Sequence, residues 1–174
     1  LEAGAGCSAL VPSLVAGVVA TDDCSTVTVT QSPAAGASIS RGATTVTLTA
    51  TDASGNTTTC TAVVTVADTI APVITDCAPD LTVSANASCS ATLPNLAAAV
   101  LTSDHCAVTV TQSPVAGSAL TVGIHTITYT ATDAGGNTAT CTSTYTVRDT
   151  TKPTITTCAT AQTVSADAAC QGTV

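Results

Sequence analysis

One thirteen-residue stretch occurs twice in the chain and sets the register of the residues around it. Residues 49–61 read Thr-Ala-Thr-Asp-Ala-Ser-Gly-Asn-Thr-Thr-Thr-Cys-Thr, and residues 130–142 read Thr-Ala-Thr-Asp-Ala-Gly-Gly-Asn-Thr-Ala-Thr-Cys-Thr. In each copy an alternating run of Thr and apolar residues enters an Asp-x-x-Gly-Asn segment, and a second alternating run follows. This pattern predicts a strand, a tight turn and a strand. We therefore expect a repeat protein whose unit contains this hairpin.

The repeat register extends well beyond the hairpin. Three residues recur 81 positions later and two cysteines recur 82 positions later; the pairs are Asp52/Asp133, Cys60/Cys141, Asp68/Asp149, Cys7/Cys89 and Cys24/Cys106. A period of about 80 residues is longer than that of solenoid repeats and suits one sandwich per repeat. Because one face of each alternating run is apolar and the other polar, we expect an all-β chain of antiparallel sandwiches.

The register divides the chain into three parts. Residues 1–68 should form a sandwich that lacks its first strand, because residues 1–7 align with residues 83–89. Residues 69–149 should form a complete sandwich, and residues 150–174 match the first strands of a third. The chain is then either a window from a longer array or a subunit that its neighbours complete.

Seven short strands are expected in the complete repeat. In the sixth, Ile127, Tyr129 and Ala131 share the face that should be buried. No helix is expected, because the helix-favouring segment Leu96–Val100 is shorter than two turns and lies in the longest loop, Asn95–His105. The expected strands are Val73–Cys77, Leu81–Ala85, Cys89–Leu93, Ala107–Gln112, Ser118–Val122, His125–Thr132 and Ala139–Arg148.

The composition argues against some functions and indicates an oxidising compartment. Charged residues make up 8% of the chain and its net charge is −8, with three basic residues in all, so we expect no nucleic-acid surface. Phe, Trp and Met are absent, so the cores bury little area per residue, and nine cysteines are available to compensate. Many cysteines with few charges indicate an extracellular, disulfide-bonded protein.

No membrane span is expected in this segment. The most apolar stretch, Ala9–Ala20, contains Pro12 and Gly17 and is too short to cross a bilayer. The residues Gly-Ala-Gly-Cys at 4–7 resemble a lipoprotein cleavage box, but Cys7 matches Cys89 in the repeat register, so we reject that interpretation. Any signal peptide would have been removed or would lie upstream.

An ordered series of short motifs carries a family resemblance. The series is Asp68-Thr-Ile-Ala-Pro72, Ile74-Thr-Asp-Cys77, Cys89, Asp104-His-Cys106, Thr109-Val-Thr-Gln-Ser-Pro114 and the hairpin Thr130–Cys141. In this order the motifs resemble the hyalin repeat (HYR) domain, an immunoglobulin-like module of extracellular and adhesive proteins. The resemblance covers nearly the whole chain and implies tandem, disulfide-stapled immunoglobulin-like sandwiches. One departure is His105, where the family usually has Asn.

The resemblance also implies a disulfide pattern. In an immunoglobulin-like sandwich the first strand runs beside the last, and family members that lack the middle two cysteines keep the first and fourth. The implied bonds are Cys77–Cys141, Cys89–Cys106 and Cys7–Cys24, and the cysteines left over are Cys60, Cys158 and Cys170.

Two of the remaining cysteines need partners outside their own repeat. By register, Cys60 needs a first-strand cysteine and Cys158 needs a last-strand cysteine. One hypothesis is strand complementation, in which residues 150–174 of one chain complete residues 1–68 of the next and Cys158 bonds that chain's Cys60. The alternative is a continuous polypeptide of many repeats with the same pairings made in cis.

Acidic residues are predicted to meet where the chain enters each sandwich from the previous repeat. The set is Asp68, Asp104, Asp133 and Asn137 in the second repeat, and Asp22, Asp23, Asp52 and Asn56 in the first. Oxygen ligands from a linker and two loops suit Ca²⁺, the one cofactor considered. The alternative is that Asp and Asn occur there because turns favour them.

No catalytic motif is found in the sequence. His105 precedes a cysteine that should be oxidised, and His125 has no candidate partner, so we expect no Cys/His nucleophile and no enzyme. The cysteine spacing does not fit a zinc site. Asn56-Thr-Thr58 and Asn86-Ala-Ser88 fit the N-glycosylation pattern.

Functions of different classes remain open. The first is a structural repeat of an extracellular fibre, filament or surface stalk, whose partner is a further copy of itself. The second is a cell-adhesion module that recognises a glycan or protein ligand through its loops. An accessory domain of a secreted enzyme ranks third.

Overall fold

The second repeat contains every strand that the sequence predicts. The computed structural model describes residues 1–165 and residue 168, and within the second repeat it places eight strands. They are β6 (Val73–Asp76), β7 (Leu81–Ser84), β8 (Ser90–Thr92), β9 (Leu101–Ser103), β10 (Val108–Ser113), β11 (Ala119–Thr121), β12 (Gly123–Asp133) and β13 (Thr138–Arg148). The ends of the seven predicted strands shift by at most two residues.

The expected long loop, Asn95–His105, contains two elements that the sequence did not predict. One is a single turn of 3-10 helix, η2 (Ala97–Ala99), and the other is β9. Strand β9 is three residues long and exists because it pairs with β6. Such pairing between distant segments leaves no local periodicity in the sequence, so a short strand of this kind is missed.

The strands of the second repeat pack as two layers. The main sheet has the order β10-β12-β13-β7, in which β7 runs parallel to β13 and the other neighbours are antiparallel. The pairs β6–β9 and β8–β11 supply side chains to the same core from the other side. The strand beside the last one is β7, the second of the repeat, and the expected first strand, β6, pairs with β9 instead. Two packed layers of mostly antiparallel strands form an immunoglobulin-like sandwich.

The first repeat has the same plan with fewer paired strands. Its elements are β1 (Ser8–Leu10), η1 (Val15–Gly17), β2 (Thr28–Ser32), β3 (Ser38–Ser40), β4 (Gly42–Thr51) and β5 (Thr57–Val66). The sheet β2-β4-β5 matches β10-β12-β13, and β1–β3 matches β8–β11. Glu2 bridges Ala67 in parallel, in the place that β7 takes beside β13.

Each repeat has its own core. The first is built from Val11, Val46 and Val66, and the second from the predicted stripe of β12 together with Leu93, Tyr145 and Val147. The predicted stripe residues Ile127, Tyr129 and Ala131 are all 0% exposed. Both aromatic side chains of the protein lie in the second core, and the Tyr129 hydroxyl is 2.9 Å from the buried Ser143 hydroxyl.

The Gln-Ser-Pro motif of each repeat fastens a loop to the sheet. The side-chain carbonyl of Gln112 accepts hydrogen bonds from the backbone N–H groups of Leu96 and Ala97, and its side-chain NH₂ donates to the backbone carbonyl of Pro94. Gln31 makes the equivalent bonds to Leu14 and Pro12. Backbone polar groups that become partly buried need hydrogen-bond partners, and this side chain supplies them to the half-buried residues Leu96 and Ala97.

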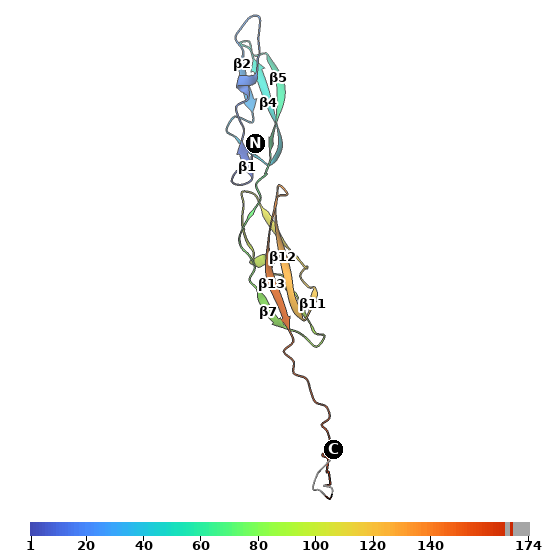
Figure 1. Cartoon of the computed structure of the whole chain (residues 1–174). Coiled ribbons are helices and arrows are strands. Elements are labelled where there is room, and N and C mark those ends of the chain that lie inside the picture. The colour runs from blue at the N-terminus through green and yellow to red at the C-terminus, as the bar shows by residue number, and fades with distance from the viewer. Residues whose placement is uncertain (166–167, 169–174) are drawn as a thin grey trace.

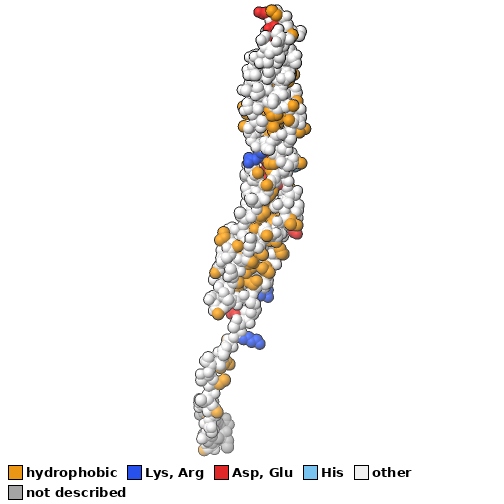
Figure 2. All heavy atoms as spheres, turned by 180° about the vertical axis from the view of Figure 1, so that it is seen from behind, with side chains coloured by type: hydrophobic (Ala, Val, Ile, Leu, Met, Phe, Trp, Pro, Cys, Tyr) orange, Lys and Arg blue, Asp and Glu red, His pale blue; other side chains and the backbone are white. Residues whose placement is uncertain are grey.

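The two sandwiches lie end to end, and residues 150–165 continue away from the second one without strand pairing (Figure 1). Acidic and basic side chains are sparse on the face seen in Figure 2, which is mostly uncharged. The protein is thus a rod of tandem, disulfide-stapled, immunoglobulin-like sandwiches, which is the predicted fold class.

Candidate functional site

The first residues of the chain bind the linker that leads into the second repeat. The backbone N–H of Ala3 donates to the carbonyl of Ala67 at 2.7 Å. The Glu2 carboxylate accepts hydrogen bonds from the backbone N–H of Thr69 at 2.8 Å and from its hydroxyl at 2.7 Å. These two hydrogen bonds lower the pKa of Glu2 below its ordinary value, and the bond from the Thr69 backbone contributes most. Sequence reasoning gave Glu2 no role, although it is the only glutamate of the chain.

A disulfide between Cys7 and Cys106 joins the two repeats across 99 residues of sequence. Beside it, the backbone N–H of Cys7 donates to the carbonyl of His105 at 3.1 Å. The predicted bonds Cys7–Cys24 and Cys89–Cys106 are therefore wrong. Cys24 and Cys89 are exposed and form no disulfide in the described part of the chain.

The geometry of one sandwich explains this correction. Cys7 lies at the start of β4, because its carbonyl accepts a bond from Arg41, one residue before the strand. Ser25, next to Cys24, lies at the other end of β4, because its hydroxyl accepts a bond from Ala53. A ten-residue strand spans about 30 Å, far beyond the reach of a disulfide. These two cysteines of a repeat therefore face opposite neighbours.

Of the other predicted disulfides, one forms within the described chain and one stays a prediction. Cys77 and Cys141 form the bond that the family resemblance implies, between the segment joining β6 to β7 and strand β13. Cys60 and Cys158, at the equivalent positions, are exposed and form no disulfide in the described residues. Cys170 lies outside the described residues.

Three predicted acidic residues meet at the entrance to the second sandwich. Carboxylate oxygens of Asp68, Asp104 and Asp133 lie within 4.8 Å of one another. Asp68 is 7% exposed and Asp133 is 6% exposed, and neither oxygen of Asp68 has a hydrogen-bond partner. The sulfur atoms of Cys7 and Cys106 are equally close to Asp68, but a disulfide offers no thiolate to a metal.

The hairpin turn of the second repeat holds this cluster against the linker. The Asn137 side-chain amide donates to the Asp68 carbonyl at 3.0 Å and to the Asp133 carboxylate at 2.9 Å. Burial alone would raise the pKa of Asp133, but the hydrogen bonds from Asn137 and from Gly136 and Gly135 hold it below its ordinary value. Asn137 was predicted as a ligand, yet its amide nitrogen is committed to positioning the linker and Asp133.

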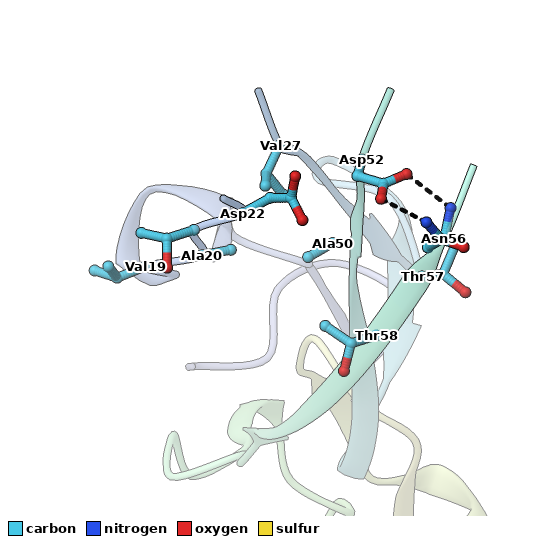
Figure 3. A pocket seen from close by; sticks show the side chains of 10 residues that line it. Val19, Ala20, Asp22, Val27, Ala50, Asp52, Asn56, Thr57 and Thr58 are labelled. Atoms are coloured by element: carbon cyan, nitrogen blue, oxygen red, sulfur yellow. Dashed lines mark hydrogen bonds between the residues drawn. The ribbon is translucent and has the colours of Figure 1, made fainter. Parts of the chain in front are cut away.

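The matching set in the first repeat is not gathered in the same way. The Asp52 carboxylate accepts hydrogen bonds from the side-chain amide and the backbone N–H of Asn56. Both bonds lower the pKa of Asp52, and the side-chain bond contributes most. The Asp22 carboxylate accepts a hydrogen bond from the backbone N–H of Cys24. Asp22 and Asp52 both line an open cleft, whose volume is about 320 Å³. Figure 3 shows the two side chains on opposite sides of it. Asp23 is exposed, and within residues 1–66 the structure holds no group of three close acidic residues.

The other singled-out residues lie apart from this junction chemistry. His125 is hydrogen-bonded to the carbonyl of Thr121, and the exposed His105 has no role beyond its backbone contact with Cys7. Asn56 and Asn86, the glycosylation candidates, both lie on exposed turns, where their side chains bond neighbouring groups. Glycosylation at either position stays a prediction.

Fold and junction together define a class, a tandem array of disulfide-stapled, immunoglobulin-like sandwiches. The HYR domain model matches residues 15–66 and again residues 67–147. The chain therefore belongs to the HYR family, whose members are repeat modules of extracellular, adhesion-type proteins. No helix in the described residues has the length and apolar character that a membrane crossing requires.

Comparison with solved structures gives distant matches only. The cadherin domains EC1–4 of PcdhgB3 are 18% identical with a TM-score of 0.30, over 74% of this chain and 40% of that one. Domains EC1–3 of mouse clustered PcdhgC3 are 17% identical with a TM-score of 0.31, over 75% of this chain and 54% of that one. The chain thus spans about half or less of these structures. No curated protein matches it.

Proposed function

We propose that this chain is a non-enzymatic structural repeat of an extracellular fibre or stalk, in which successive HYR sandwiches are joined end to end. The observation that carries the proposal is the Cys7–Cys106 bond, because it links two sandwiches to each other. A module that acted alone through its loops would gain nothing from a covalent bond to its neighbour. A rod that bears tension along its axis would gain directly.

The first sandwich has an open edge where the second has a strand. In the second repeat β6 pairs with β9, and Cys77, just after β6, is bonded to Cys141 of β13. In the first repeat the equivalent place is the cleft of Figure 3, lined by Val19–Asp22 on one side and Thr57 and Thr58 on the other. The first five residues of β5 are all exposed, whereas the first five residues of β13 alternate between exposed and half-buried.

Residues 154–158 match the missing strand. They read Thr-Ile-Thr-Thr-Cys, against Val-Ile-Thr-Asp-Cys at residues 73–77. Ile155 is 78% exposed, whereas its counterpart Ile74 packs against the second core. We propose that this segment of a second copy adds to the open edge of residues 1–68 and that Cys158 bonds Cys60. Strand addition at an open edge supplies main-chain hydrogen bonds, and Ile155 would fill a pocket.

The bond pattern predicts a second cross-link between the same two copies. Cys7 of one repeat bonds Cys106 of the next, so by register Cys89 should bond Cys24 of the copy that follows. Both cysteines are exposed, as such a bond between copies requires. Two cross-links and one shared strand would make each new junction covalent, like the one inside the chain.

Peptide mapping without reduction tests the assembly. The recombinant chain should form ladders of oligomers on non-reducing gels, with Cys60–Cys158 and Cys24–Cys89 peptides, and electron micrographs should show thin fibres. The variant Ile155→Asp should block strand addition, whereas Val115→Asp, at an exposed position of the second sandwich, should assemble normally. Monomers in which Cys24, Cys60, Cys89 and Cys158 all remain free thiols would refute strand exchange between copies. Monomers in the native material would refute the fibre.

A further inference from the structure

We infer that the cluster of Asp68, Asp104 and Asp133 at the junction is an intramolecular cation site that binds Ca²⁺. The three carboxylates come from the linker, from the loop before Cys106 and from the end of β12. They are far apart in sequence, yet their oxygen atoms lie within 4.8 Å of one another. Two oxygens bound to one Ca²⁺ at about 2.4 Å can be no farther apart than that.

Asp68 is the residue that ordinary turn chemistry does not explain. Its side chain is more than nine-tenths buried, and both of its oxygens are inaccessible and without a hydrogen-bond donor. An ionised carboxylate in this state has lost its water and gained nothing in return, which is strongly unfavourable. By contrast, its repeat counterpart Asp149 is exposed and accepts a bond from Thr151. The buried Asp68 carboxylate therefore needs a positively charged partner, and the structure shows none.

The other two carboxylates are held in place by their own turns. Asp104 accepts a bond from the backbone N–H of Cys106, and Asp133 accepts two bonds from Asn137. Each oxygen has more than one lone pair, so these bonds orient the carboxylates without exhausting their capacity as ligands. The site is preorganised, with two positioned carboxylates facing one that has no partner.

No protein cation neutralises the cluster. The basic residues of the chain are Arg41, Arg148 and Lys152, and no ion pair with an acidic residue occurs in the described residues. Three carboxylates without a counter-charge repel one another, and a bound cation would relieve this repulsion. Hard oxygen ligands with no nitrogen or thiolate select Ca²⁺ over transition metals. Asp104 is only half-buried, which leaves a path for the ion to enter.

Calcium titration of the whole chain tests the site. After removal of metal with EDTA, adding millimolar CaCl₂ should raise the Tm, and Tb³⁺ should bind with a luminescence that Ca²⁺ displaces. The variant Asp68→Asn should weaken Ca²⁺ binding at least tenfold. In EDTA it should melt at a higher temperature than the wild type, because it removes an unpaired buried charge. The exposed Asp76 provides the matched control, since Asp76→Asn removes the same charge outside the cluster and should leave both results unchanged.

Two results would overturn the inference. One is a Tm that is the same in EDTA and in CaCl₂, with Asp68→Asn more stable than the wild type in both, which would mean that no metal ion compensates Asp68. The other is Ca²⁺ binding that Asp68→Asn leaves unchanged, which would place the ion elsewhere. Neither result bears on the fibre, since the disulfide ladders are read separately.

Discussion

Gly135 packs so closely against the carbonyl of Asp68 that a Cβ atom at this position would overlap that oxygen. The same Cβ would also lie 2.9 Å from the side-chain nitrogen of Asn137, which bonds this carbonyl. This close approach lets the hairpin turn of the second repeat pack directly against the linker at Asp68, where Asn137 can donate its hydrogen bond. The first repeat has Ser54 at the equivalent position, so a linker entering that repeat cannot copy this contact without a shift.

The substitution Gly135→Ser, which copies the first repeat, should destabilise the junction. The overlap involves backbone, which cannot rotate away, so we expect a loss of about 1–3 kcal/mol in the unfolding free energy of the second sandwich. Urea unfolding measures the change. Ser54→Ala is the matched control and should change stability by less than about 0.5 kcal/mol. An unchanged Gly135→Ser variant would contradict the close approach.

Removing the disulfide between the repeats should uncouple them. The double variant Cys7→Ser/Cys106→Ser opens a loop of 99 residues, for which the chain-entropy model gives about 4–5 kcal/mol. We expect unfolding in two separate steps and a broader distribution of shapes in small-angle X-ray scattering. Cys24→Ser/Cys89→Ser alters exposed cysteines without a bond and should leave the monomer unchanged. A single, unshifted transition in Cys7→Ser/Cys106→Ser would contradict the coupling.

Much of the fold could be predicted because its signals are local. Alternation placed the stripe of β12, and the repeat register placed the hairpin turns and brought Asp68, Asp104 and Asp133 to one end. The errors are non-local. Strand β9 exists through its pairing with β6, and nothing near Cys7 in the sequence states that it faces the next sandwich.

The disulfide error has a specific lesson. The family resemblance implied the bond Cys7–Cys24 within the first repeat, but β4 holds these two cysteines at opposite ends of the sandwich. The burial of the turn aspartates could not be predicted from the sequence either. Asp52 and Asp133 occupy equivalent turns, but only Asp133 is buried, because the linker covers it.

The hydrogen bond between Tyr129 and Ser143 should show strong coupling between its partners. Tyr129→Phe leaves the buried Ser143 hydroxyl without its partner, at a cost of about 1–3 kcal/mol, and Ser143→Ala does the same to the tyrosine. The double variant Tyr129→Phe/Ser143→Ala removes both polar groups, so it should lose less than the sum of the two single variants. A double-mutant cycle by urea unfolding measures this difference, and strict additivity would contradict the bond.

The turn of the first repeat should weaken in acid. The bonds from the Asn56 side chain and backbone lower the pKa of Asp52 below its ordinary value of 3.8. The stabilisation is therefore complete above pH 3.8 and is lost as the pH falls through the lower folded-state pKa. The wild type should be more stable than Asp52→Ala at neutral pH, and this difference should shrink below pH 3.8. Asp23→Asn, at an exposed residue near the same end, is the control and should show no such convergence. A difference between wild type and Asp52→Ala that stays constant down to pH 2 would show that the ionised carboxylate does not hold the turn.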